Sequence, residues 1–156
     1  MSDDRNARRS LLQSNVRRFC ADLVVPVPPP KLLSQHFRPD GPKITEHGPS
    51  WASARLPFLG KTFTGTEECI EYFDVLSEVL GMKLADDAFP WKGGFIVDGE
   101  VGMVSVVGKG RFESKKTGKG WDEQFIYRFS DFDDQGRIGH WEVWADPLSA
   151  WEAVGE

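Results

Sequence analysis

The stretch GRIGHWEVWADP, residues 136–147, sets three ionisable side chains among tryptophans. Side chains of a regular strand alternate between its two faces, so His140, Glu142 and Asp146 would share one face with Trp144. An imidazole and carboxylates held together can transfer protons, or they can form an ion pair on a solvated surface. The chemistry of this strand therefore depends on whether that face lines a cavity or meets solvent.

His47 is a second candidate for proton transfer, and the alternative for it is a histidine in a surface turn. It ends a short strand predicted over residues 43–48. Its neighbour Glu46 points the opposite way in a regular strand, so at most one of the two faces a cavity. Asp146 precedes Pro147, a position that suits the N-cap of a C-terminal helix as well as it suits chemistry.

The composition indicates one globular domain, residues 1–156, that is long enough to bury a core. Six tryptophans and eleven phenylalanines can fill that core or line a pocket for an apolar ligand. The net charge of −5 argues against nucleic acid as a partner, because phosphate binding needs a basic surface.

The sequence carries no signal for a membrane or for secretion. The polar start MSDDRNARRS lacks an apolar segment, and no run is long enough to span a bilayer, so we expect a cytoplasmic protein with no membrane insertion. Cys20 and Cys69 lack a CxxC spacing, so both are expected to be buried and reduced.

Several other chemistries are excluded by their missing motifs. The chain has no GxSxG serine motif and no HxxxH pair, and its three histidines are scattered, so no metal site is expected. The segment Gly108-Lys109-Gly110 lacks the third glycine and the following helix of a dinucleotide loop. The residues therefore give no sign of a dinucleotide-binding loop.

Helices are predicted in the first half of the chain. Leu12, Val16, Phe19 and Leu23 recur at helical spacing and predict a helix over residues 3–24. A long aromatic loop over residues 48–65 is expected to cover a binding site.

A second helix is predicted from Thr64, with Glu67 completing a capping box and Gly81 just beyond its end. After Gly81, turn signals divide the chain into strands, followed by a helix from Pro147. The fold class is α+β, with a curved antiparallel sheet wrapped around helices. The predicted strands cover residues 83–89, 94–97, 101–113, 121–132 and 136–147.

Four segments carry a resemblance to a known family: HGPSW (47–51), LPFLGKTFTG (56–65), TGKGWDEQFIYRF (117–129) and GRIGHWEVWADP (136–147). Their order resembles the SnoaL-like polyketide cyclase group, in the superfamily of nuclear transport factor two and ketosteroid isomerase. The resemblance implies a cone-shaped α+β barrel with a deep pocket, a homodimer through the outer sheet face, and no metal or organic cofactor.

The resemblance also implies an activity. The expected function is an isomerase or cyclase that acts on a small apolar polycyclic substrate from polyketide or terpenoid biosynthesis. The alternatives are a dehydratase, an epoxide hydrolase or a non-catalytic binder of an apolar ligand. The epoxide-hydrolase alternative is weakened because the chain lacks the Arg-x-Asp pair that this branch uses.

The resemblance leaves the register of the last strand open. The family carries a His-Trp-Asp triplet whose carboxylate faces the pocket, and His140-Trp141-Glu142 matches it. An ungapped match counted from residue 136 instead turns Trp141, Val143 and Ala145 inward. We favour Glu142 inward because the triplet match is better than the spacing match, although this needs a missing residue or a bulge.

With that register, Glu142 is the expected acid/base group, His140 orients it, and His47 contributes from across the cavity, with Asp146 as a further candidate. Segment 48–65 is expected to be a lid over the pocket. The residues expected to bind the substrate are Trp51, Phe58, Phe63, Phe125, Tyr127, Trp141 and Trp144.

Overall fold

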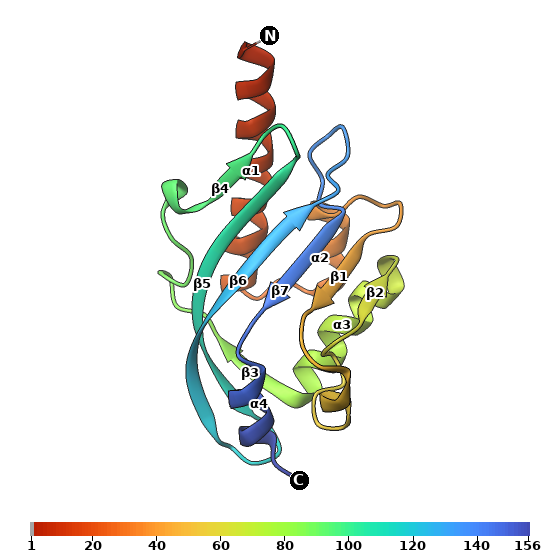
Figure 1. Cartoon of the computed structure of the whole chain (residues 1–156), viewed down its shortest axis with the longest axis vertical. Coiled ribbons are helices and arrows are strands. Elements are labelled where there is room, and N and C mark those ends of the chain that lie inside the picture. Colours follow the sequence, from red (N-terminus) through yellow and green to blue (C-terminus); the bar gives the residue numbers. More distant parts are fainter. Residues whose placement is uncertain (1) are drawn as a thin grey trace.

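The computed structural model describes residues 2–156 and shows an α+β fold built on one curved sheet (Figure 1). The helices are α1 (Ser2–Val24), α2 (Pro29–His36), α3 (Thr66–Val79) and α4 (Pro147–Val154), with short 3₁₀ turns η1 (Ser50–Ala54) and η2 (Lys92–Gly94). The strands are β1 (Lys43–Glu46), β2 (Thr62–Thr64), β3 (Leu80–Lys83), β4 (Ile96–Asp98), β5 (Met103–Ser114), β6 (Gly120–Ser130) and β7 (His140–Trp144).

The sheet runs in the order β2-β1-β7-β6-β5-β3, and β4 pairs with another part of β5. All pairs are antiparallel except β1 with β7, which run parallel. The predicted α+β class is confirmed, but the expected all-antiparallel sheet is wrong at this one pair. The parallel pair places Glu46 directly beside Val143 and so decides which β1 side chain faces inward.

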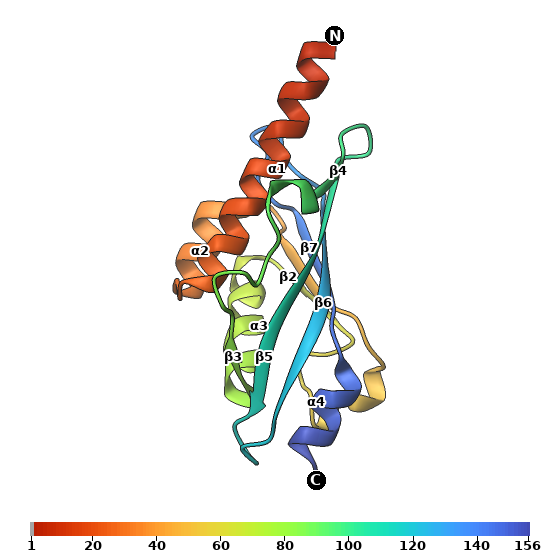
Figure 2. The same ribbon diagram turned by 90° about the vertical axis from the view of Figure 1, so that its left-hand side faces the viewer.

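Helices α1, α2 and α3 cover one face of the sheet, and the N-terminal end of α1 projects beyond it (Figure 2). The spacing prediction for α1 is confirmed, since Leu12, Val16 and Phe19 are fully buried. Phe19 packs edge-to-face against Phe129 and Trp141 from the sheet. The core therefore lies between the inner face of the sheet and these helices.

The start and end of α3 differ from the prediction. The helix begins at Thr66 after Gly65, whose φ of 91° is a conformation that favours glycine, and Gly65 provides no side-chain cap. The backbone amide of Thr64 donates to Glu68 Oε1, so the expected capping box with Glu67 does not form. Gly81 lies within β3 rather than beyond a helix end.

The strand predicted over residues 83–89 is mostly a loop, because the pairing of β3 with β5 ends at Lys83. The side chain of Leu84 occupies the space that a Cβ atom at Gly110 would need. The absence of a side chain at Gly110 therefore lets this loop pack closely against β5. The predicted irregular segment 48–65 contains η1 and β2, and Gly60 anchors it by donating to Glu46 O at 2.9 Å.

Candidate active site

An apolar pocket with a free volume of about 60 Å³ lies between the inner face of the sheet and α3. One end is closed by the start of α4. Three acidic residues, Glu46, Glu123 and Asp146, are among its lining residues, together with Tyr72 and Tyr127. The remaining lining is apolar: Leu23, Leu56, Phe58, Phe73, Leu76, Leu80, Met82, Phe112, Phe125, Trp141, Val143, Ala145, Pro147 and Ala150.

Glu46 is the buried carboxyl of this pocket. It shares the inner face of β1 with Ile44, which is fully buried, and only 7% of Glu46 is exposed. Burial raises the pKa of Glu46 to about 7, while the hydrogen bond from Tyr72 acts to lower it and the charge of Glu123 acts to raise it. A carboxyl with this pKa is populated in both protonation states near neutral pH, as a general acid or base requires.

Tyr72 supplies the single protein hydrogen bond to the Glu46 carboxyl among residues 2–156. Its hydroxyl donates to Glu46 Oε1 at 2.7 Å. Tyr72 and Cys69 lie one turn apart on α3, and both are buried. Burial, together with Glu46, raises the pKa of Tyr72 well above its ordinary value, so this hydroxyl stays protonated and remains a donor.

Glu123 is the second carboxyl, and its orientation is fixed from two sides. Its Oε1 accepts from Trp121 Nε1 at 2.8 Å, and its Oε2 accepts from the backbone amide of Asp146 at 3.0 Å. Burial raises the pKa of Glu123, while these two hydrogen bonds act to lower it. Glu123 also acts through space to raise the pKa of Glu46, so its charge bears on the other carboxyl of the pocket.

The face of the last strand that lines the pocket is the opposite of the one we favoured. Trp141, Val143 and Ala145 line the pocket, so the prediction that Glu142 faces inward is wrong. The alternation of side chains between the two faces breaks at Gly139. A Cβ atom at this position would lie 2.0 Å from Asp131 O, so only glycine fits there. Beyond this point β7 pairs with β6 in unbroken register, with no bulge to turn Glu142 inward.

Glu142 lies on the outer face of the sheet in an ion-pair cluster. Arg128 donates to both carboxylate oxygens, at 2.8 and 3.1 Å, and His47 Nε2 lies 3.0 Å from Oε1. Burial acts to raise the pKa of Glu142, but the hydrogen bonds from Arg128 and His47 outweigh it and the pKa lies below its ordinary value. Such a carboxylate stays ionised and committed to its partners, which suits structure better than proton transfer.

The remaining predicted catalytic residues are divided between the outer face of the sheet and the edge of the pocket. His140 Nε2 lies 2.9 Å from Thr45 Oγ1 on the outer face, and burial lowers its pKa. Asp146 accepts from the backbone amide of Ser149 at 3.1 Å, so the expected N-cap is present, and the residue also borders the pocket. The structure therefore brings His47, His140 and Glu142 to one face, but that face is outside the pocket.

Four of the predicted binding residues line the pocket and three do not. Phe58, Phe125, Tyr127 and Trp141 are lining residues. Phe63 is buried in the core against Tyr72. Trp51 is 70% exposed and packs against Trp151. Trp144 is 37% exposed and stacks on His47. The prediction that these two tryptophans line the pocket is therefore wrong.

The signals that would have found the missed carboxyls are patterns of alternation. Glu46 follows Ile44 by two residues, and Glu123 precedes Phe125, Tyr127 and Phe129 on one face of β6. A lone carboxylate on an otherwise apolar face indicates a buried acid. The histidines, which are more familiar as proton-transfer groups, lie on the outer face instead.

An open groove of about 680 Å³ lies along β5 and β6, and two of its cations are paired at the surface. Lys109 contacts Asp87 at 3.1 Å, and Arg111 contacts Asp122 at 3.4 Å. Across residues 2–156, no three His, Cys, Asp or Glu side chains gather in an arrangement that could hold a metal ion. Over the same range, no helix combines the length and apolarity needed to cross a membrane.

Comparison with known proteins establishes the fold. No model of a known protein family matches the chain, and no curated protein matches it. Solved structures do match: an NTF2-like protein of unknown function from Burkholderia pseudomallei has 20% identity and a TM-score of 0.73, with 94% of this chain and 98% of that chain covered. The chain therefore has the NTF2-like fold.

Two further neighbours carry more informative names. TerC, crystallised with polyporic acid, has 19% identity and a TM-score of 0.67, with 92% of this chain and 98% of that chain covered. A candidate polyketide cyclase from Xanthomonas campestris pv. campestris has 11% identity and a TM-score of 0.68, with 95% and 99% covered. At these identities the likeness establishes the architecture and leaves the activity to the site.

Proposed function

We propose that this protein is a cofactor-free isomerase or cyclase that moves a proton on an apolar intermediate of polyketide or terpenoid biosynthesis. The observation that carries the proposal is Glu46, a carboxyl in an aromatic pocket whose pKa lies at about 7. Its only hydrogen-bond donor within residues 2–156 is Tyr72, so the oxygen Oε2 has no protein partner. Neighbours named as cyclases and isomerases support this class of reaction.

In the proposed reaction, the Glu46 carboxylate takes a proton from a carbon of the bound substrate and returns it at another position. Tyr72 holds the carboxyl in place throughout, because its own proton does not leave near neutral pH. Glu123 adds a second negative charge that favours the protonated form of Glu46 after transfer. Aromatic walls exclude water and hold the carbon skeleton.

The free volume of about 60 Å³ is far below the 300–1,000 Å³ of typical ligand pockets, so a bulky substrate has to displace lining side chains. We propose that segment 48–65 moves as the lid, since it contributes Leu56 and Phe58 to the wall. A non-catalytic binder of apolar ligands is the second candidate, favoured by the mainly apolar lining and by TerC, a neighbour crystallised with a small molecule.

The test is exchange of carbon-bound protons into heavy water, followed by NMR on a panel of apolar polyketides and terpenoids. We expect wild type to catalyse exchange on at least one compound, and Glu46→Gln to lower that rate by roughly 10²- to 10⁴-fold while still binding it. Glu71→Gln, an exposed carboxylate on the same helix as Tyr72, is the matched control and should keep the wild-type rate.

The Glu142→Gln variant tests whether proton exchange takes place in the pocket or on the outer face of the sheet. Loss of exchange in Glu142→Gln with full exchange in Glu46→Gln would move the chemistry to the outer face and overturn the proposal. Tight binding without exchange by wild type, across the panel, would make the protein a binder.

We further propose that the protein is a homodimer through the outer face of the sheet. Val107 lies directly beside Ile126, and Ile126 beside Trp144, so three exposed apolar side chains form one row across β5, β6 and β7. The cations near this row are paired, such as Arg128 with Glu142 at 2.8 Å. A nearly neutral face lets two chains of net charge −5 approach one another.

Light scattering tests the dimer. At micromolar concentration we expect twice the 17.6 kDa chain mass for wild type and a single chain mass for Ile126→Glu. Val101→Glu, which adds the same charge at an exposed apolar residue in the turn before β5, should remain dimeric. A monomeric wild type would refute the dimer, and a dimeric Ile126→Glu would place the interface on another face.

A further inference from the structure

A polar groove of about 560 Å³ lies between α1, the end of α2 and the loop that joins β6 to β7. Its volume is within the range of roughly 300–1,000 Å³ that is typical of ligand pockets. None of its lining residues lines the pocket that holds Glu46. All of them except Ala21 carry polar side chains: Asn15, Arg18, Ala21, Asp22, Gln35, His36, Gln135 and Arg137.

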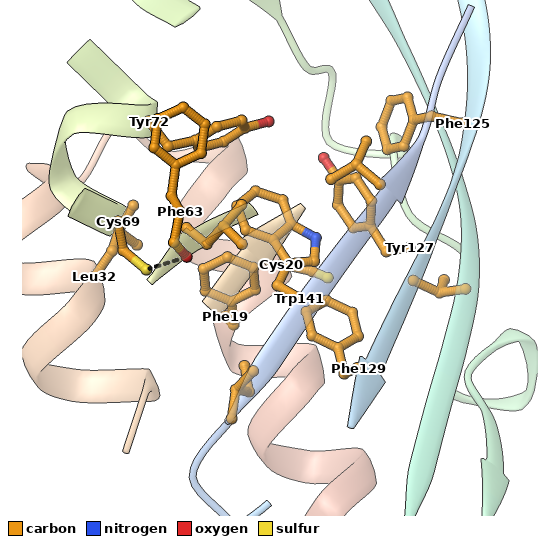
Figure 3. Close-up of a cluster of buried hydrophobic side chains, with 14 of the residues drawn as sticks. Phe19, Cys20, Leu32, Phe63, Cys69, Tyr72, Phe125, Tyr127, Phe129 and Trp141 are labelled. Atoms are coloured by element: carbon orange, nitrogen blue, oxygen red, sulfur yellow. Dashed lines mark hydrogen bonds between the residues drawn. The ribbon is translucent and has the colours of Figure 1, made fainter. Parts of the chain in front are cut away.

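The α1 wall of this groove follows from helical spacing. Asn15, Arg18 and Asp22 are three and four residues apart, so they lie on one side of the helix. Phe19 points from a neighbouring side of α1 into the aromatic cluster around Trp141 (Figure 3). The polar stripe of α1 therefore lies beside its buried face and outside the core.

Hydrogen bonds hold the three walls of the groove together. The side-chain amide of Asn15 donates to Gly136 O at 2.7 Å, which fixes the β6–β7 loop against α1. His36 Nε2 lies 2.7 Å from Asp22 Oδ2 and joins the end of α2 to α1. The backbone amide of Ile138 donates to His36 O at 2.8 Å and joins α2 to the loop. The groove therefore has fixed walls, as a preformed ligand site requires.

The groove contains two guanidinium groups with free donors. Arg18 donates to the neutral amide oxygen of Asn15, and within residues 2–156 no carboxylate forms an ion pair with it. Arg137 donates from Nε to Asp133 at 2.7 Å, and its two terminal nitrogens have no hydrogen-bond partner in the same part of the chain. Guanidinium groups bind carboxylate and phosphate oxygens through two parallel hydrogen bonds, so the groove suits an anion.

The other lining groups favour a ligand that also carries hydroxyls. Asp22 is the single carboxylate of the lining, so two arginine charges face one negative charge. The amide side chains of Gln35 and Gln135 both donate and accept hydrogen bonds, which suits hydroxyl groups. Because the lining has almost no apolar side chain, the groove does not suit the apolar compounds proposed for the other pocket.

We infer that this groove binds a small hydroxylated oxyanion, with its phosphate or carboxylate group on Arg18 and Arg137 and its hydroxyls on the amide side chains. This ligand is distinct from the substrate of the proposed reaction, because the groove and the pocket share no lining residue. The inference therefore stands or falls separately from the proposed function.

Three sugars that differ only at carbon 6 test the inference: glucose 6-phosphate, glucuronate and glucose. In titration calorimetry of the full chain at neutral pH and low salt, we expect at least one of the two anions to bind about tenfold or more tightly than glucose. A preference for the phosphate or for the carboxylate identifies the oxyanion that the arginines select. Inorganic phosphate that binds as tightly as glucose 6-phosphate would mean an adventitious ion only and would overturn the inference.

Arginine variants test whether the charges of the groove hold the anion. Arg18→Gln and Arg137→Gln should each weaken binding of the preferred anion about tenfold and leave the affinity for glucose unchanged. Arg17→Gln is the matched control, since it removes an exposed arginine of the same helix that does not line the groove. An equal loss in Arg17→Gln would mean a diffuse attraction to the helix and would contradict a built site.

The NMR ring signals of the three histidines locate the bound anion. His36 lines the groove, whereas His47 and His140 lie on the outer face of the sheet. His47→Gln and His140→Gln assign the signals and leave the groove intact. We expect the His36 signal to move on binding and the other two to stay. Binding that leaves the His36 signal in place, or no binding of either anion at about 10 mM, would also overturn the inference.

Discussion

Raising the pH from about 4.5 to 7.5 is expected to lower the free energy of unfolding by about 3 kcal/mol through Glu46 alone. The carboxyl has an ordinary pKa of 4.5, and burial raises it to about 7 in the folded protein. Between these values the folded state holds a proton that the unfolded state has released. The contribution of Glu46 is therefore fully present below pH 4.5 and is lost as the pH rises through 7.

Glu46→Gln isolates this effect, because the amide keeps the shape and can still accept from Tyr72. Urea unfolding of wild type and Glu46→Gln at a series of pH values gives the free energy of unfolding of each protein as a function of pH. The two free energies should diverge by about 3 kcal/mol toward pH 7.5, with the variant the more stable at high pH. Glu71→Gln, at an exposed position, should run parallel to wild type. Parallel curves for Glu46→Gln would mean that water reaches the carboxyl and that its pKa is ordinary.

Truncating the two tryptophans of β7 is expected to give very different losses of stability. Trp141→Ala should lower the free energy of unfolding by about 3 to 5 kcal/mol, because it removes a ring packed against Phe19, Phe73 and Phe129. Trp144→Ala should cost about 1 kcal/mol or less, because the side chain is 37% exposed. Urea unfolding of both variants at one protein concentration gives the comparison.

This pair of variants also tests the register of the last strand. Similar losses at both positions would mean that the outer face is as buried as the core. If the loss for Trp144→Ala grew with protein concentration, it would come from the dimer interface rather than from the folded chain. A small loss for Trp141→Ala would contradict the assignment of that face to the pocket.

The sequence by itself determined the fold class and most of the elements. The spacing of Leu12, Val16 and Phe19 predicts α1 and its buried face, because helical periodicity is a local property that burial reinforces. The turn signals separate β5 from β6, and Asp146 before Pro147 marks the start of α4 with its cap. Four segments of the chain were enough to predict the NTF2-like fold.

Only the tertiary structure decided which face of each strand lines the pocket. Alternation groups Glu142 with His140 and groups Trp141 with Val143, but it is symmetric and does not say which group is inside. The close approach of Gly139 to Asp131 and the packing of α1 and α3 settle it by burying the Trp141 face. The parallel pairing of β1 with β7 then places Glu46 beside Val143 on the inside and His47 on the outside, a consequence of contacts about 95 residues apart in the chain that local patterns do not contain.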